Sequence, residues 1–354
     1  MNRRTRRTLL VVAAVLVLLA VAIFLRSKAP PEAARLLPES DGIVYVDLKP
    51  VRTFFRKDMK LKPPERVPEY QQFVDATGID WERDLDQAAI ALHRMEDPKG
   101  PNGPVAYSMV LGGKLTGPRL NAWLEANATS RETYAGHVVY SIPSEGRTVR
   151  VTQIGYDMVA VSNFPTPEKI HSMLDRHRTA ALPFAGSTLL SEHFHEVPLL
   201  SLAWGVGQIG LPFNESGAIS ILGFQLPIQA DSTIVASLAP ELSLTGTPSD
   251  KPSGLGWLTG TMRLRVEEIA PSSEAAQSQA AALATLVTLA RGFTAPLNEN
   301  AANRGLKDLL KTAEVTQNRN RVTVRATVSG SLFAGLAADA SQSSNSGASP
   351  QPVH

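Results

Sequence analysis

The stretch RVTVRATV at residues 321–328 decides the fold class of this chain. Every second position is apolar, and arginine or threonine fills the positions between them. Because successive side chains of a β-strand point to opposite faces, this alternation predicts a strand with one buried face and one solvated face. Such a strand is typical of an antiparallel sheet, and here we expect it to be the second strand of a hairpin.

Upstream of this strand the apolar pattern switches repeatedly between periods of 2 and 3.6 residues. The strongest helical signal follows Pro271, where an apolar stripe is formed by Ala276, Ala280, Leu283, Val287 and Ala290. Further strands are predicted at 43–48, 88–93, 105–111, 137–142, 149–154, 158–162, 199–204, 233–238 and 258–266, and further helices at 51–59, 69–77 and 306–311 and from residues 116 and 166.

This mixture predicts an α+β fold with two lobes, mainly antiparallel sheets, and helices packed on one face. Both halves contain a strand pair, a helix, a hairpin and a second helix in that order, which is typical of a duplicated unit but also of α+β proteins without a repeat. The predicted division is a basic cytoplasmic segment 1–8, a transmembrane signal anchor 9–25, a linker 26–37, lobes 38–185 and 186–338, and a disordered tail 339–354.

The N-terminus has the pattern of a membrane anchor. Four arginines lie within the first seven residues, and an uninterrupted apolar run of 17 residues extends from Leu9 to Leu25. At ~1.5 Å per residue the run would form a helix about 25 Å long, near the lower limit for spanning a bilayer. The basic flank predicts a cytoplasmic N-terminus, a single pass through a bacterial inner membrane, and a main domain in the periplasm or outside the cell.

A cleavable export signal is the competing interpretation of the same segment. Ala20-Val21-Ala22 fits the small-x-small rule for signal cleavage, and residues 5–10 resemble a twin-arginine signal. The apolar run continues past Ala22 without a polar break, which favours the anchor. Both interpretations export the remainder of the chain.

Composition excludes several classes of protein. Hydrophobic residues make up 43% of the 354 residues and charged residues 19%, as in a globular chain. The net charge is +2, and because four arginines precede residue 8, the remainder is close to neutral and nucleic acid is disfavoured as a partner. The absence of cysteine excludes disulfides, thiolate metal ligands, a cysteine nucleophile and a lipid-modified cysteine.

Residues 205–210, GVGQIG, match the glycine pattern of a dinucleotide-binding loop, with Asp231 further along the chain. That site also needs a helix to begin directly after the glycines, so that its N-terminus faces the phosphates. Leu211-Pro212-Phe213-Asn214 follows instead, which favours a glycine connection in an apolar segment, and no cofactor is predicted.

Residues 192–196, EHFHE, are the densest group of possible metal ligands. His193 and His195 could begin a zinc site, but such a site needs at least one more ligand, and the sequence does not identify it. The alternative is a solvated turn with Phe194 packed inward.

His171, Asp175 and His177 are predicted to lie on one helix, with His171 and Asp175 one turn apart. This spacing would suit a base and the carboxylate that orients it. It would equally suit the polar face opposite Ile170 and Met173. The sequence contains no G-x-S-x-G motif, the pattern that would indicate a serine hydrolase.

The segment 199–238 carries only two charged residues, Glu215 and Asp231. Such a segment could line an apolar groove, contact a partner or the bilayer, or form the central core.

The segments RLLPESDGIVYVDLKPVR, TGIDWERDLDQAAIAL, YAGHVVYSI and IGYDMVAVSN resemble a group of uncharacterised bacterial membrane-anchored proteins of unknown function. The resemblance covers much of the exported region and implies an anchored envelope protein, without catalytic or binding residues. Because the chain has a single predicted anchor and no complete catalytic constellation, we expect a non-enzymatic binding module of the envelope whose partner is another protein or an apolar ligand. The alternatives are a metal-dependent envelope hydrolase using His193 and His195, and a carrier of lipid or another apolar molecule.

Overall fold

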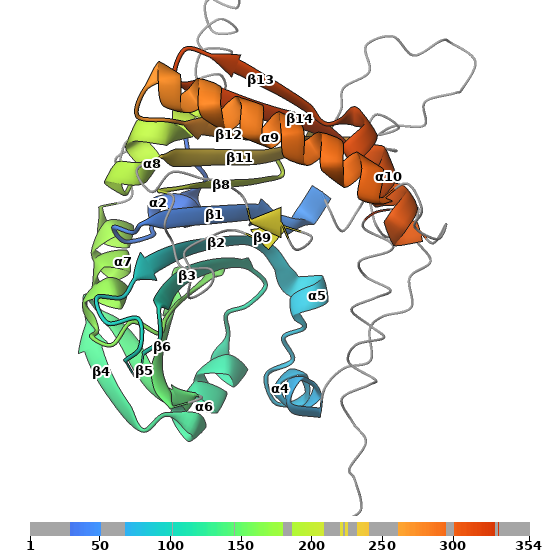
Figure 1. Cartoon of the computed structure of the whole chain (residues 1–354). Coiled ribbons are helices and arrows are strands. Elements are labelled where there is room, and N and C mark those ends of the chain that lie inside the picture. The colour runs from blue at the N-terminus through green and yellow to red at the C-terminus, as the bar shows by residue number, and fades with distance from the viewer. Residues whose placement is uncertain are drawn as a thin grey trace, which may run out of the picture.

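The computed structural model has a mixed α+β architecture built on one large antiparallel sheet (Figure 1). The residues that the structure describes are 29–50, 68–100, 102–144, 146–179, 186–208, 220–221, 224–225, 232–240, 261–294, 301–329 and 332.

The sheet has twelve strands in the order β13-β14-β12-β11-β8-β1-β2-β3-β7-β6-β5-β4. Neighbouring strands pair antiparallel throughout, as the alternation at 321–328 predicts. Their bounds are β1 Gly42–Asp47, β2 Leu85–Arg94, β3 Val105–Gly113, β4 Ser130–Tyr134, β5 His137–Ser144, β6 Arg147–Ile154, β7 Met158–Ser162, β8 Ala203–Gln208, β11 Thr233–Pro240, β12 Thr261–Ile269, β13 Glu314–Asn318 and β14 Arg321–Ser329. A separate pair is formed by β9 (Ser220–Ile221) and β10 (Phe224–Gln225).

The two halves of the chain share this sheet, whereas the sequence predicted a sheet for each lobe. Strand β8, the first of the second half, pairs with β1, the first of the chain, and Trp204 lies opposite Tyr45. Their rings stack with centroids 5.5 Å apart. Pairing β1 on both sides leaves no open strand edge between the halves, which is the physical advantage of a continuous sheet. Duplication of the two halves stays a prediction.

One face of the sheet is covered by α2 (Glu32–Arg35), α7 (Glu168–Arg178) and α8 (Thr188–His193). Figure 1 shows these helices together on one side of the strands. Their buried side chains pack on inward residues of β1, β2, β3, β7, β8 and β11 in a single core cluster, which includes Leu190, Met173 and Trp204. We call this the first face.

The predicted linker 26–37 is wrong in its second half. Residues 32–35 form α2, and Ala33, Ala34, Leu36 and Leu37 are at most 1% exposed within the core of the first face. The proline and alanine content of this segment is typical of a spacer. Its last residues, however, include two leucines and two alanines, and burial of their apolar surface stabilises the fold. Among the described residues, α2 is therefore the first element of the fold.

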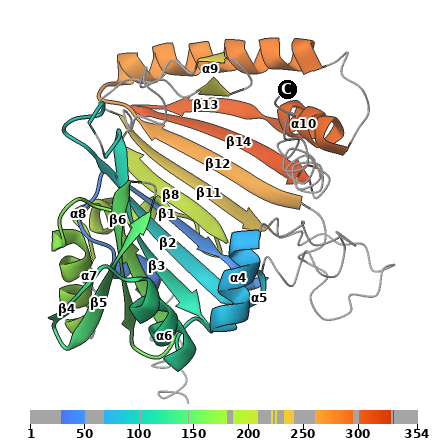
Figure 2. The same cartoon turned by 90° about the horizontal axis from the view of Figure 1, so that it is seen from below.

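The opposite, second face carries helices at both ends of the sheet (Figure 2). At one end α4 (Pro68–Thr77), α5 (Trp81–Asp84) and α6 (Pro118–Asn127) surround a cluster that includes Leu111, Leu124 and Val159. At the other end α9 (Ser273–Thr294) packs against Val322, and α10 (Ala301–Thr312) packs against Val328. Helices thus cover both faces, contrary to the prediction of one, because strands such as β7 (MVAVS) are apolar on both sides.

Several predicted elements are confirmed, and others differ. The apolar stripe after Pro271 is α9, with Ala276 fully buried. The strand predicted at 199–204 is displaced, because Pro198 to Ser201 form a turn in which Leu200 has φ +70°, and β8 begins at Ala203. Strand β4 was missed because its sequence, SRETY, carries no apolar alternation.

Predictions for four segments fall on residues that the structure does not describe: the basic segment 1–8, the transmembrane segment 9–25, the helix 51–59 and the tail 339–354. Within the described ranges, none of the helices combines the length and apolar character needed to span a bilayer.

Candidate functional site

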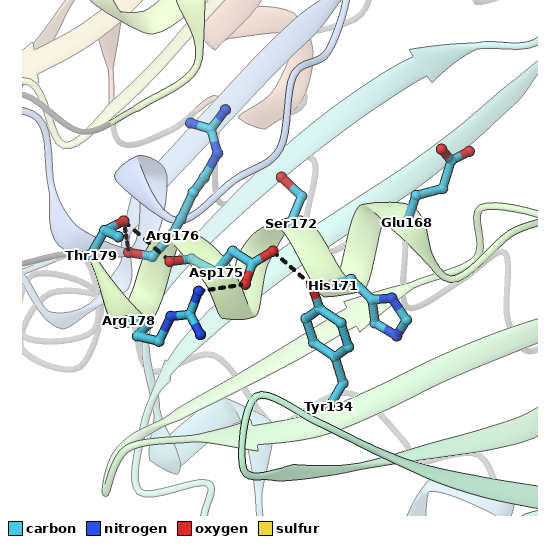
Figure 3. A pocket seen from close by; sticks show the side chains of 8 residues that line it. All are labelled: Tyr134, Glu168, His171, Ser172, Asp175, Arg176, Arg178 and Thr179. Atoms are coloured by element: carbon cyan, nitrogen blue, oxygen red, sulfur yellow. Dashed lines mark hydrogen bonds and ion pairs between the residues drawn. The ribbon is translucent and has the colours of Figure 1, made fainter.

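Helix α7 presents a polar surface opposite its buried residues. Ile170, Met173 and Leu174 point into the core, as the sequence predicts, so His171 and Asp175 point outward. Together with β4 they border a shallow depression of about 470 Å³ (Figure 3). The side chains that line it are Tyr134, Glu168, His171, Ser172, Asp175, Arg176, Arg178 and Thr179.

Each of the two predicted catalytic groups is bound by a residue of β4. The Tyr134 hydroxyl donates to Asp175 Oδ2 over 2.9 Å, and His171 Nε2 lies 2.8 Å from Glu132 Oε1. The rings of Tyr134 and His171 stack with centroids 3.8 Å apart and planes 5° from parallel. Figure 3 shows the tyrosine hydroxyl directed at the carboxylate and its ring beside the imidazole.

The structure does not assemble the base and orienting carboxylate that the spacing suggested. Asp175 orients Tyr134 instead of His171, and the carboxylate beside the imidazole is Glu132. His177 lies apart from this group, edge-on to His137 with ring centroids 5.8 Å apart. Burial, and secondarily the neighbouring His137, lower the pKa of His177. The depression can therefore hold a polar ligand by hydrogen bonds, and the carboxylate partner of its imidazole is Glu132 in place of the predicted Asp175.

The charges around the depression are arranged in pairs. The hydrogen bond to Asp175 raises the pKa of Tyr134, and Arg178 lies 3.6 Å from the same carboxylate. Arg176 points to the opposite side of α7 (Figure 3), where it donates to Glu39 over 2.7 Å. Glu39 also accepts from the Thr188 backbone amide over 2.9 Å, so it joins α7 to the start of α8.

Sequence analysis missed Glu132 and Tyr134 because their strand was not recognised. Their spacing of two places both side chains on one face of a strand, which is the signal that could have found them. A spacing of two indicates a shared face only in a strand, and no strand was predicted here.

The proposed metal ligands lie in the short helical region after α8. His193 ends α8, and His195 belongs to the 3-10 turn Phe194–Glu196, with its side chain 69% exposed. His195 Nε2 lies 3.1 Å from Glu196 Oε1, and the same oxygen accepts from Arg321 over 2.7 Å. Chiefly through this hydrogen bond, Arg321 lowers the pKa of Glu196. In the described part of the chain no three His, Asp or Glu side chains gather as a metal site would require, and the metal site stays a prediction.

The glycine motif has a different setting from a dinucleotide loop. Gly205 and Gly207 lie within β8, where Gly205 stands opposite Val44 and Gly207 opposite Gly42 of β1. Ile209, Gly210 and Asp231 fall outside the described residues. Two glycines two positions apart in a strand remove side chains from the same face of the sheet.

These glycines lie in the middle of the second face. Strand register places a group of small and apolar residues side by side there, between the helices at the two ends. We call this group the apolar strip: Gly42, Val44, Val46, Ala203, Gly205, Gly207, Ile234, Ala236 and Leu238. Most of its members are only half-buried, and Val44 is 38% exposed.

The dimensions of the apolar strip follow from strand geometry. It crosses β1, β8 and β11, which at ~4.8 Å between neighbouring strands gives a width of about 10 Å. Five residues along each strand give a length of about 15 Å at ~3.3 Å per residue.

Comparisons with known protein families and with curated proteins find no match. Solved structures similar to this chain include three crystal forms of TP0453. Form III has 10% identity and a TM-score of 0.45, covering 88% of this chain and 99% of that chain. Form I has 11% identity and a TM-score of 0.41 over 89% and 98% of the two chains, and form IV has 11% and 0.41 over 87% and 96%. At this distance the likeness carries no inference about function.

Proposed function

We propose that this protein is a non-enzymatic, membrane-anchored binding module outside the cytoplasm, and that its ligand is an apolar chain held on the apolar strip. The observation that carries the proposal is the pair of glycines in β8 beside the half-exposed Val44. Apolar side chains that remain partly exposed in the middle of a sheet favour a ligand that covers them.

The glycine at position 205 is not explained by crowding. A methyl group there would lie 3.4 Å from the carbonyl oxygen of Ile43 and 3.7 Å from Val44 Cγ2, which are ordinary contacts. Glycine also weakens a strand interior, and a common reason for its presence is the close approach of a ligand. The bare backbone at this position supports close approach of a ligand to the strand.

The character of the strip favours an apolar ligand over a charged one. Neither β8 (AWGVGQ) nor β11 (TIVASLAP) contains a charged residue. The predicted anchor at 9–25 would hold the domain beside a bilayer, which is a source of acyl chains. A lipid or related apolar molecule is therefore the ligand class we propose.

The test places a large side chain on the apolar strip. Gly205→Leu would place a side chain over the strip, and we expect the full-length protein, reconstituted in amphipol, to lose most of its binding of a fluorescent fatty acid. Tyr156→Ala is the matched control, because Tyr156 is 98% exposed at the turn between β6 and β7 and should leave binding unchanged. Equal binding by the wild type and Gly205→Leu, with both folded, would contradict the proposal.

The metal-dependent alternative predicts a different result in the same preparations. Elemental analysis would find about one metal ion per chain, lost in a His193→Ala, His195→Ala double variant. The apolar-ligand proposal expects no stoichiometric metal, and mass spectrometry of an organic extract should instead recover a lipid that the Gly205→Leu protein lacks.

A further inference from the structure

A buried polar cluster lies beneath α9, at the edge of the second face. Glu268 of β12 is 5% exposed, and Gln279 of α9 and Ser232, which precedes β11, are equally inaccessible. Glu268 Oε1, Ser232 Oγ and Gln279 Nε2 are all without a completed hydrogen bond. A buried polar atom without a partner destabilises the fold, so these three atoms matter for how α9 is held.

No cation faces Glu268 among the described elements around it. Ile234 of β11 and Val322 of β14 stand directly opposite it in the sheet. The charged residues of the surrounding elements are engaged elsewhere. Arg321 pairs with Glu196 and Glu267 on the first face, Arg291 donates to the carbonyls of Leu310 and Ala313, and Glu274 accepts from Ser273 at the exposed start of α9.

The remaining charges of β12 and β14 belong to the other side of the sheet. Arg263, Arg265 and Arg325 alternate with the inward residues of the second face, so they project from the first face with Glu267. Strand β11 has no charged residue. A negative charge on Glu268 would therefore be buried without a counter-ion among these elements.

Few apolar contacts hold the first half of α9 on the sheet. Its buried residues there are Ala276 and Gln279, and Ala275, Ala280 and Leu283 pack partly against the same cluster. The three alanines bury little surface, so Leu283 is the one large apolar side chain among them. The last turns are fixed differently, because Arg291 Nε and a terminal nitrogen donate to Leu310 and Ala313 carbonyls over 2.8 and 2.6 Å. The helix is thus tied at its end and lightly held at its beginning.

We infer that α9 is a pH-sensitive cover, whose first half sits on the sheet while Glu268 is protonated and loosens when Glu268 ionises. Burial raises the pKa of Glu268, and the nearby Ser232 and Gln279 side chains offset this only in part. A group with a raised pKa stabilises the closed form below the ordinary carboxyl pKa of about 4.5 and loses this contribution as pH rises through the folded value. Loosening would uncover Val322 and the inner face of α9.

Hydrogen exchange of the full-length protein tests this inference. Between about pH 5 and 9 we expect protection of amides 276–287 to fall by tenfold or more, while amides 288–294 stay protected. Glu268→Gln, which keeps the shape and cannot ionise, should abolish the fall. Glu274→Gln is the matched control, a glutamate of the same helix in an exposed position, and should leave the fall unchanged.

Three results would overturn the inference. They are a flat wild-type profile, a fall that persists in Glu268→Gln, and a fall that disappears in Glu274→Gln. Gln279→Leu gives a second route should Glu268→Gln not fold. Losing the amide donor makes the ionised form less favourable, so the fall should move to higher pH, and an unchanged or lower midpoint would count against the cover.

Discussion

Strand β12 places two adjacent glutamates in opposite surroundings. Glu267 and Glu268 are 3% and 5% exposed, and they project from opposite faces of the sheet. Glu267 is paired with Arg265 and with Arg321, whose NH1 donates over 2.9 Å. Glu268 has Ser232 and Gln279 nearby and one carboxylate oxygen without a partner. Equal burial of the same side chain therefore comes with two arginine partners on one face, and on the other face burial raises the pKa of the carboxyl group.

The ion pairs on the first face, where Glu267 lies, also connect distant parts of the chain. Arg321 donates to Glu196 as well as to Glu267, so a single guanidinium joins β14, β12 and the turn after α8. These two hydrogen bonds raise the pKa of Arg321. The comparison predicts that the first face depends on its cation, whereas the second face depends on the proton of Glu268.

Removing the cation should have the largest effect. Arg321→Ala would leave Glu196 and the buried Glu267 without their shared partner, and we expect a loss of about 3 kcal/mol, at the low end for a buried pair because the guanidinium is 37% exposed. The measurement is the free energy of unfolding in urea. Arg325→Ala, an exposed arginine on the same strand and face, is the matched control and should cost under about 1 kcal/mol. Equal losses in both variants would refute the network.

A buried histidine tests the opposite pH dependence. His93 is 3% exposed, its Nε2 lies 2.9 Å from Ser108 Oγ, and burial, more than the nearby Lys169, lowers its pKa to about 4. A lowered pKa means that its contribution to stability is present above pH 6.5 and is lost as pH falls toward 4. We expect a loss on the order of 2 kcal/mol near pH 4.5 that His93→Gln, which can still bind Ser108, removes.

The check for His93 is the urea midpoint of both proteins at neutral and acid pH. Because many carboxylates contribute to acid sensitivity, the informative quantity is the difference between wild type and variant. A variant as acid-sensitive as the wild type would show that His93 does not contribute.

Substitution of Glu268, the glutamate without an arginine partner, should change the free energy of unfolding only slightly. Glu268→Gln replaces a group that favours its protonated form with a neutral isostere, so we expect a change in unfolding free energy within about 1 kcal/mol at pH 6. Glu267→Gln, one residue away, should lose about 2 kcal/mol because it removes charge-assisted hydrogen bonds. The measurement is urea unfolding of the two variants in parallel. A larger loss of stability in Glu268→Gln than in Glu267→Gln would contradict the comparison.

The smallest effect is expected for an exposed carboxylate. Asp175 raises the pKa of Tyr134 by accepting its hydrogen bond at the surface of α7. Asp175→Asn should shift the ionisation of Tyr134 to lower pH, followed by NMR of a ¹³C-labelled tyrosine ring, with no measurable change in unfolding. Tyr134→Phe identifies the signal. An unmoved titration would mean that the bond in Figure 3 does not form in solution.

Much of the local structure could be predicted because it depends on neighbouring residues. The alternation at 321–328 places Val322 and Val328 on the buried side of β14, and the stripe after Pro271 places Ala276 on the buried side of α9. The inward side of α7 follows from the same periodicity. The candidate site was predicted only in part, since His171 and Asp175 were found but their partners lie on β4, whose polar sequence shows no period.

The sequence by itself determined which residues of each strand and helix point to the same side, since this depends only on the repeat of the backbone. Only the tertiary structure decided what packs on each side: that β1 joins β8, that α2 belongs to the core, and that Glu267 meets arginines while Glu268 does not. The physical reason is that strand pairing and burial connect residues far apart in the chain, such as Arg321 and Glu196. A local sequence pattern shows which side of an element is apolar, but it does not identify the distant segment that packs against that side.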